Sequence, residues 1–236
     1  MKKQLIVVLV FLAGISAVSA QQAGQFSAGA RLGGVFGFHS MDVDFDDIES
    51  KMNFNFGVYG AYAVMDGLSI QAELNFMITQ GVKESFSYYW EDDYYGDYYS
   101  EKGTSTITYS SLDIPILVKY TLMYEPMLIG ILAGPYLSIP ISDMEASFDV
   151  SVEEYDSYYG YDYYTGSGTN KTPTDGITFG LTAGLFLGYP IGPGLFVGDI
   201  RFSFDLSSQK AKERGESFDV ISRRGLAVSV GYEISF

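Results

Sequence analysis

The sequence predicts an all-β fold, an eight-stranded antiparallel up-and-down transmembrane β-barrel with four long extracellular loops. Eight segments alternate apolar with polar or small residues at a period of two, which is the pattern of strands. The connections alternate between tight turns and long segments, a layout typical of outer-membrane barrels with both termini on the short-turn side. Aromatic residues gather at both ends of the apolar faces, around an aliphatic middle, as they do at two membrane interfaces.

The first three strands are predicted at residues 25–39, 52–64 and 68–78. Each places large apolar side chains on one face and small or polar side chains on the other. Asp66-Gly67 joins the second strand to the third and suits a two-residue hairpin turn. The connection between the first two strands, residues 40–51, is long and acidic.

The other five strands follow the same rule, at residues 111–121, 128–142, 177–189, 196–206 and 225–236. Pro135 and Pro140 cannot donate a backbone hydrogen bond, so we expect bulges in the fifth strand. Tight turns follow the fourth and sixth strands. Long connections follow the third, fifth and seventh, at residues 82–105, 143–175 and 207–222. An even number of strands returns both termini to the same side of a closed barrel.

The volume of the barrel interior decides between two predictions, a membrane barrel with its apolar face outward and a soluble barrel with its apolar face buried inside. An eight-stranded barrel has room for little more than modest side chains, and the large apolar face would overfill it. The opposite face is mostly Gly, Ser, Thr and Ala, which fit a narrow lumen. Outward aromatic residues near the short turns are Phe26, Tyr62, Tyr120, Tyr189, Phe196, Tyr232 and Phe236. Those near the long connections are Phe36, Phe38, Phe54, Phe56, Phe76, Phe179, Phe202 and Phe204.

The N-terminus has the features of a secretory signal peptide. Two lysines precede an apolar run from Leu5 to Ile15, and small residues suited to signal peptidase follow. Such a run would rise only about 16 Å as a helix, too little to span a bilayer. The sequence therefore predicts a signal peptide at residues 1–20, export, and an outer-membrane β-barrel domain at residues 21–236.

Composition excludes several classes of protein. The 236-residue chain has no cysteine, which excludes a disulfide framework, a cysteine-ligated metal and a lipid-modified cysteine. Its 14 Lys+Arg and 29 Asp+Glu give a formal net charge of −15, whereas a nucleic-acid binder needs a basic surface. We therefore expect no nucleic-acid partner, and nothing in the sequence points to a cofactor.

Short motifs in the second half of the chain resemble a known family. The fourth predicted strand contains Asp113-Ile114-Pro115 and ends in Lys119-Tyr120, and the fifth contains Gly134-Pro135-Tyr136. With Gly192-Pro193-Gly194 and Asp199-Ile200-Arg201, these motifs resemble the PorT-type outer membrane β-barrel family of Bacteroidetes, with an OmpA/OmpX-like architecture. The resemblance covers nearly all of the mature chain. It implies a porin-like outer-membrane barrel and no specific activity.

The C-terminus also resembles a recognised signal. Phe236 follows Ile234 and Tyr232 at alternate positions, the pattern read by the machinery that inserts barrels. We therefore expect this machinery and outer-membrane lipid among the partners of the chain.

Charged residues on the inward face raise the question of a pore. The predicted lumen charge network is Arg31, Glu73, Asp113, Lys119, Asp199, Arg201 and Glu233, and Asp205 falls on the same inward face. Counted from the turns, Glu73 falls at the height of Lys119, and Glu233 falls near Arg31 and Arg201. Charges inside a membrane protein pair or meet water, so the set forms either an ion path or a salt-bridged plug. The narrow lumen of eight strands favours the plug.

Two long connections are rich in tyrosine and acidic residues. Tyr with Ser, Gly and Asp gives amphipathic contact surface at low entropic cost, as binding loops do. The alternative is a solvated, partly disordered segment. The candidate binding residues are Trp90, Tyr94, Tyr95, Tyr98, Tyr99, Tyr158, Tyr159, Tyr161, Tyr163 and Tyr164.

The sequence offers one acidic segment as a metal candidate and one histidine as a catalytic candidate. Asp42, Asp44 and Asp46 begin like a calcium loop but lack the Gly and distant Glu of an EF-hand. His39 is the single histidine, and no nucleophile motif accompanies it. The sequence therefore predicts a non-enzyme.

The functional hypothesis is a monomeric barrel with a structural or surface-interaction role toward an unknown extracellular ligand. The main alternative is a small porin or channel, or an accessory component of a secretion machinery. A minor alternative is an outer-membrane lipid-modifying enzyme.

Overall fold

The computed structural model describes residues 23–40, 48–50, 52–92, 95–124, 126–156, 158–213 and 216–236. The secondary-structure elements in these ranges are all β-strands, which confirms the all-β prediction. Within the described segments, no helix is long and apolar enough to cross a membrane. The predicted signal peptide, residues 1–20, lies outside the described residues.

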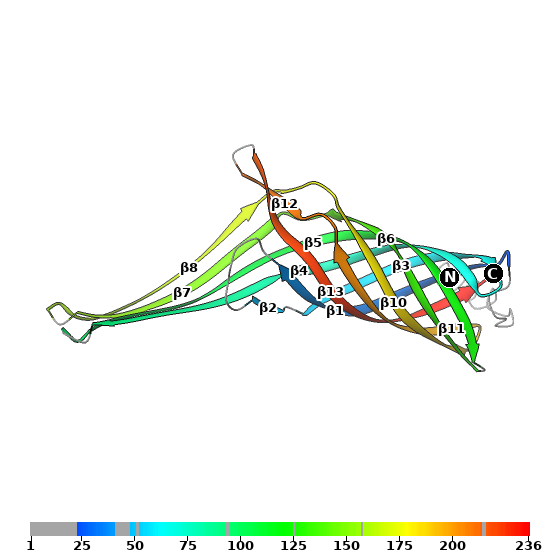
Figure 1. Cartoon of the computed structure of the whole chain (residues 1–236), viewed down its shortest axis with the longest axis horizontal. Coiled ribbons are helices and arrows are strands. Elements are labelled where there is room, and N and C mark those ends of the chain that lie inside the picture. The colour runs from blue at the N-terminus through cyan, green and yellow to red at the C-terminus, as the bar shows by residue number, and fades with distance from the viewer. Residues whose placement is uncertain are drawn as a thin grey trace, which may run out of the picture.

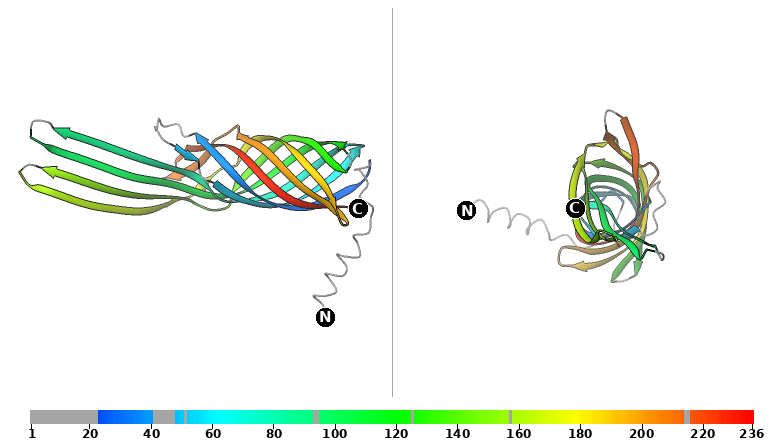
Figure 2. Two further views of the ribbon diagram at one scale, coloured as in Figure 1. Left: turned by 90° about the horizontal axis from the view of Figure 1, so that it is seen from below. Right: turned by 90° about the vertical axis from the view of Figure 1, so that its left-hand side faces the viewer.

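A closed ring of antiparallel strands forms the body of the molecule (Figures 1 and 2). Going round the ring, β4-β3-β1-β13-β11-β10-β6-β5 are neighbours, and β5 pairs again with β4. Each ring strand therefore pairs with the next ring strand along the chain, an up-and-down order. The ring strands are β1 (Phe26–Ser40), β3 (Met52–Met65), β4 (Leu68–Asp92), β5 (Asp97–Tyr124), β6 (Met127–Pro140), β10 (Thr178–Ile191), β11 (Gly194–Asp205) and β13 (Glu216–Ser235).

The two faces of the ring differ in chemistry because side chains alternate along each strand. In β3 the pattern of exposed and buried residues alternates almost without interruption, with Asn53, Asn55 and Tyr59 buried inside. Outward residues such as Leu32 and Phe54 stay more than 60% exposed on the isolated chain. Because the ring is closed, the backbone N–H and C=O groups of each ring strand form hydrogen bonds with the neighbouring strands. A strand in lipid requires this, because no water is present to bind these groups.

Exposed aromatic side chains lie at both ends of the ring. Near the short turns they are Phe26, Tyr62, Tyr120, Tyr189, Phe196 and Phe236, and near the other end they include Phe36, Phe54, Phe56, Phe76, Phe179 and Phe202. Phe26 lies 4.7 Å from Tyr62, and Phe56 lies 5.0 Å from Phe76, as ring-centroid distances. This distribution matches two interfacial aromatic belts.

Beyond the ring, four strands continue as one antiparallel sheet that projects from the end opposite the short turns (Figures 1 and 2). It consists of residues 81–92 of β4 and 97–108 of β5, with β7 (Met144–Asp156) and β8 (Gly160–Thr172). Its order is β4-β5-β7-β8. We call it the projecting sheet, and its outward face is the one that continues the lipid-facing surface of the ring.

The long connections at residues 82–105 and 143–175 were predicted as loops, and this prediction is wrong. They form the projecting sheet and β9 (Thr174–Asp175). The fourth connection holds β12 (Gln209–Glu213), which pairs with the start of β13, and the described part of the first holds β2 (Ile48–Ser50). Cross-strand pairing supplies order that Gly-, Ser- and Asp-rich sequence does not indicate by itself.

The bulges also lie elsewhere than predicted. The pairing of β5 with β6 keeps one register on both sides of Pro135, with no bulge there. Pro115 faces Tyr136 on one side, and Val118 faces Ala133 on the other. A proline removes one donor but fits extended backbone, so it interrupts pairing without shifting it. In the ring strands the observed register shifts lie between Ala63 and Met65 and between Met77 and Gln80, and a further shift lies between Gln209 and Lys210 of β12.

Candidate functional site: the lumen and the projecting sheet

All seven predicted lumen charges are buried, each with 8% or less of its surface exposed: Arg31, Glu73, Asp113, Lys119, Asp199, Arg201 and Glu233. They lie on inward positions of the ring strands β1, β4, β5, β11 and β13. Because a buried charge is costly unless it is paired, their partners decide whether the lumen is stable.

The central layer of the lumen balances two cations against two anions. Glu73 lies 2.5 Å from Nη2 of Arg31 and 2.8 Å from Nη1 of Arg201. Asp199 lies 2.7 Å from Nε of Arg201 and 3.7 Å from Nη1 of Arg31. Asn75 also donates a hydrogen bond to Glu73, at 2.9 Å. The layer is therefore a compact ionic network.

Closer to the short turns lies a second ion pair with an apolar layer beside it. Nζ of Lys119 lies 3.0 Å from Oε2 of Glu233 and 4.6 Å from the centre of the Phe186 ring. Phe186 belongs to a buried apolar cluster with Leu117, Leu132, Leu195 and Val197. These side chains fill the lumen near the short-turn end.

A third layer lies toward the projecting sheet, and its central residue was missed by the sequence analysis. Arg223 lies 2.8 Å from Asp113 and 3.6 Å from Asp205, and it donates a hydrogen bond of 2.6 Å to Gln80. Tyr136 donates to Asp205 at 2.5 Å. Position 223 is in phase with the inward residues of β13, so continuing the alternation by one more pair would have found it.

Glu73 and Lys119, which were predicted to lie at the same height, do not pair with each other. Glu73 pairs with Arg31 and Arg201, and Lys119 pairs with Glu233. Ser69, four residues before Glu73, is the residue that faces Lys119 across β4 and β5. Strands of a barrel are tilted and staggered, so equal counts from two different turns do not give equal heights.

The voids between the charged layers are small. One of about 50 Å³ lies among Arg31, Asp113, Arg201 and Arg223, and one of about 10 Å³ lies among Tyr59, Lys119 and Phe186, among others. About 10–15 Å³ of such space is enough for one water molecule, so the first void has room for a few waters and the second for about one at most. Side chains therefore fill most of the described lumen.

The predicted binding tyrosines lie on the two faces and at the tips of the projecting sheet. Strand alternation and register place Tyr89, Tyr98, Tyr155, Tyr161 and Tyr163 on the outward face. On the other face lie Tyr88, Trp90, Tyr99 and Tyr164. Tyr95, Tyr158 and Tyr159 lie at the hairpin tips, and Tyr94 lies outside the described residues.

On the outward face, tyrosines stack across strands and converge on one carboxylate. Ring centroids are 6.4 Å apart for Tyr89 and Tyr98 and 5.9 Å apart for Tyr98 and Tyr155. Tyr161 and Tyr98 both donate hydrogen bonds to Glu153. These bonds, that of Tyr161 first, hold the pKa of Glu153 below its usual value.

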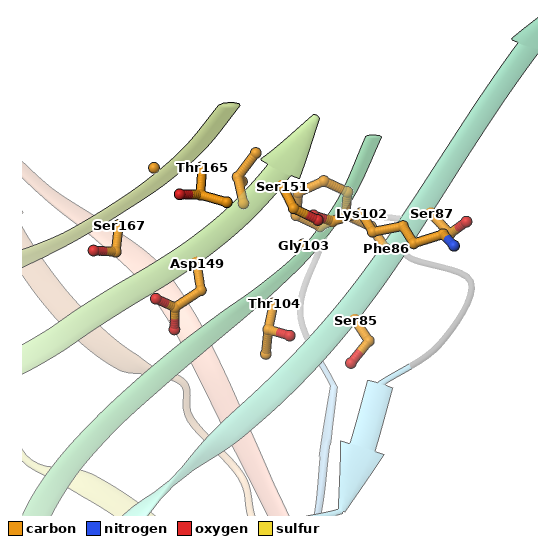
Figure 3. A pocket seen from close by; sticks show the side chains of 12 residues that line it. Ser85, Phe86, Ser87, Lys102, Gly103, Thr104, Asp149, Ser151, Thr165 and Ser167 are labelled. Atoms are coloured by element: carbon orange, nitrogen blue, oxygen red, sulfur yellow. The ribbon is translucent and has the colours of Figure 1, made fainter. Parts of the chain in front are cut away.

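A groove of about 690 Å³ lies on the projecting sheet (Figure 3). Along the strands it lies between the ring and most of the tyrosines. All four strands contribute to it. Its lining residues are Ser85, Phe86, Ser87, Lys102, Gly103, Thr104, Asp149, Val150, Ser151, Thr165, Gly166 and Ser167. Figure 3 shows Ser85, Thr104, Asp149 and Ser167 following one another across neighbouring strands. The sequence analysis did not single out these small polar residues.

The remaining predicted sites concern metal, catalysis and insertion. Within the described ranges, no group of three or more His, Cys, Asp or Glu side chains could hold a metal ion. Asp42, Asp44 and Asp46 and the side chain of His39 lie outside the described part. Phe236 is 66% exposed at the end of the chain, and its backbone N–H donates to Phe26. Tyr232 donates to the carbonyl of Ile191 at 2.7 Å, and Ile234 is partly exposed.

A family model described as an outer membrane protein beta-barrel domain matches residues 19–211, well over half of the chain. The chain belongs to this family. This outer-membrane barrel therefore resides in the outer membrane of a Gram-negative bacterium, with its ring crossing the bilayer.

Solved structures similar to this outer-membrane barrel have low sequence identity. OprG from Pseudomonas aeruginosa has 12% identity and a TM-score of 0.49, covering 92% of this chain and 98% of that one. A major outer membrane protein from Thermus thermophilus has 12% identity and a TM-score of 0.44, covering 91% and 100%. Neisserial surface protein A has 12% identity and a TM-score of 0.40, covering 89% and 97%. No curated protein matches the chain.

Proposed function

We propose that this outer-membrane barrel is a closed scaffold that holds the projecting sheet at the cell surface for contact with an extracellular ligand. The observation that carries the proposal is the contrast between its two halves. The lumen is packed with paired charges, while the sheet beyond it exposes tyrosines on both faces.

The packed lumen argues against the alternative of a small porin. An aqueous path would have to separate buried ion pairs, and removing one partner of such a pair costs about 3–5 kcal/mol. Eight strands also leave little interior space once side chains fill it. The charges then hold the barrel shut and do not conduct ions.

The projecting sheet has the chemistry of a recognition surface. Tyr161 and Tyr163 are 60% and 58% exposed, and Tyr158 and Tyr159 at a hairpin tip are each 85% exposed. Tyrosine gives a large contact area with few rotatable bonds, which suits binding to protein or sugar. The long strand extensions act in place of loops, with the four long connections on the extracellular side.

Several finer assignments belong to the same proposal. The Asp113-Ile114-Pro115 and Gly134-Pro135-Tyr136 motifs support a PorT-type affiliation, and some relatives of that type are accessories of secretion machinery. We take the barrel to be monomeric, inserted by the barrel insertion machinery, and not an enzyme of lipid modification.

Cells that display wild-type or variant protein test the proposal. One variant replaces the described tyrosines at 95–99 and 158–164 with serine, and another changes the acidic residues of the projecting sheet to amides. Adherence to host matrix, sugars and other bacteria is measured across salt concentrations. Binding by tyrosine survives salt, whereas binding by exposed charge weakens as salt screens it over about 8 Å. The proposal fails if neither variant differs from wild type in any assay.

A further inference from the structure

The groove on the projecting sheet lies on its outward face. Two cross-strand rows place side chains on that face, Ser85-Thr104-Asp149-Ser167 and Ser87-Lys102-Ser151-Thr165. The row between them, Phe86-Gly103-Val150-Gly166, points its side chains to the other face. All members of the three rows line the groove, while the rows beyond them do not. The outer rows thus form walls, and the backbone of the middle row forms the floor.

The walls are polar and offer hydrogen bonds of both kinds. They carry six hydroxyl groups, the ammonium of Lys102 and the carboxylate of Asp149. A hydroxyl group donates and accepts, as the hydroxyls of a sugar do. Neighbouring strands lie about 4.8 Å apart, and alternate residues of one strand lie about 6.6 Å apart, which spaces these groups on the scale of a sugar ring.

Tyrosine rings border the groove on the same face. Tyr89 and Tyr163 occupy the next row out and are 59% and 58% exposed. An aromatic ring offers an apolar surface to the C–H groups of a sugar, and its hydroxyl offers a polar edge. A polar trough beside exposed tyrosines therefore fits a chain of sugars better than an apolar ligand.

The position of the groove indicates where such a sugar chain would come from. Even-numbered residues of β5 all lie on its outward face. Ile116 and Leu112 face lipid in the ring, and Thr104 and Lys102 lie on the same face in the projecting sheet. Thr104 lies eight residues beyond Leu112, or about 26 Å along the strand at about 3.3 Å per residue. Leu112 faces Phe76 of the outer aromatic belt, so the groove lies beyond the headgroup layer, at a height that the sugar chain of a lipid in the outer leaflet would reach.

Charge supports the same occupant. The described projecting sheet carries three lysines, Lys83, Lys102 and Lys171, and strand alternation places all three on the outward face. The outward face also carries four carboxylates, Glu91, Glu145, Asp149 and Glu153, which nearly balance its lysines, whereas the other face carries carboxylates such as Glu101 and Glu154 without a lysine in the described rows. The nearly neutral outward face can therefore lie toward an anionic leaflet, whereas the acidic opposite face would be repelled by it.

We propose that this groove binds the sugar chain of a glycolipid anchored in the same outer leaflet. The inference rests on the proposed function, because it names the ligand of the projecting sheet. The hydroxyl rows bind sugar hydroxyl groups, Tyr89 and Tyr163 pack against sugar C–H groups, and Lys102 faces anionic groups of the sugar chain.

Full-length protein in nanodiscs tests the proposal with purified lipopolysaccharide, either with its complete sugar chain or with a truncated one that keeps the lipid and its phosphates. Hydrogen exchange at residues 102–106, 147–151 and 165–169 is compared. We expect at least threefold slower exchange with the complete chain only. Equal protection by both forms would mean that lipid or phosphate is recognised, and it would overturn the proposal.

Matched variants separate this groove from the rest of the sheet. Tyr88 and Tyr89 are neighbours with 56% and 59% exposure, on opposite faces. Binding of the oligosaccharide released from lipopolysaccharide is measured by titration. We expect Tyr89→Ser, and the charge-neutral pair Lys102→Gln with Asp149→Asn, to weaken binding about tenfold, and Tyr88→Ser to change it less than twofold. Equal effects of Tyr88→Ser and Tyr89→Ser would overturn the proposal.

The two proposals fail separately. If wild type binds no oligosaccharide but displaying cells still bind a protein or a soluble host polysaccharide through the tyrosines, the glycolipid proposal is wrong and the surface-interaction function stands. If the tyrosine and acid-to-amide variants also match wild type in every adherence assay, both are wrong.

Discussion

Glu73 and Arg201 form an ion pair of 2.8 Å across the full diameter of the barrel. Their strands, β4 and β11, are four strands apart in either direction round the ring. Lys119 with Glu233 and Arg223 with Asp113 also join strands on opposite sides, β5 and β13. Three cross-lumen ion pairs therefore brace the ring at three heights.

Ion conductance should be nearly absent. Purified wild-type protein in planar bilayers should show little steady current, because side chains fill the lumen and the voids of about 50 Å³ and about 10 Å³ are small. Large, stable, ion-selective current steps from wild type would instead favour the small porin.

Removing the central carboxylate should destabilise the barrel strongly. Glu73→Ala removes a carboxylate that neutralises the buried guanidinium groups of Arg31 and Arg201. We therefore expect the free energy of unfolding to fall by about 3–5 kcal/mol. Urea unfolding of protein refolded in lipid vesicles measures it. The control is Glu145→Ala, which breaks an exposed pair of 3.0 Å with Lys171 and should cost about 1 kcal/mol or less. Equal losses would contradict the role of the central layer.

The C-terminal phenylalanine should matter for assembly. Phe236 is 66% exposed and continues the lipid-facing side of β13, whereas Ser235 before it faces inward. Phe236→Ser should reduce the amount of heat-modifiable, folded protein in the outer membrane severalfold, and Ser235→Ala should not. A terminal recognition signal is ruled out if both variants assemble like wild type.

One tyrosine of the projecting sheet should lose its proton only at an unusually high pH. Tyr99 donates a hydrogen bond of 3.0 Å to Glu101, and this bond, with desolvation, raises the pKa of Tyr99 to about 12. Because the pKa is raised in the folded protein, the protonated Tyr99 stabilises the fold fully at pH values below its ordinary pKa of about 10. This stabilisation is lost as the pH rises through about 12. Ultraviolet difference titration of wild type against Tyr99→Phe measures it. Glu101→Gln should lower the pKa of Tyr99, and an unchanged pKa would contradict the assigned cause.

Alternation along the strands predicted the ring and its inward charges, because burial on one face imposes a period of two. It did not predict which charges pair, since strand tilt decides whether Glu73 meets Lys119 or Arg201. The projecting sheet was missed for another reason. Its residues, such as Ser85, Thr104 and Ser167, are polar on a water-exposed face, so no apolar period marks them as strands.

The bulge between Met77 and Gln80 determines which side chains of β4 meet the surroundings. Ile78 and Thr79, the latter with a φ of 55°, occupy the span that Ser110 alone occupies on β5. Odd-numbered residues of β4 face the lumen up to Met77, and even-numbered residues do so from Gln80 onward. If the same sequence paired without the bulge, Thr79 would face Tyr109, and Tyr89 would turn inward and Tyr88 outward, whereas deleting Thr79 would leave Gln80 opposite Tyr109 and both tyrosines on their present faces. One extra residue at the rim thus decides which alternate residues face outward on the surface half of the strand, independently of the membrane-embedded half.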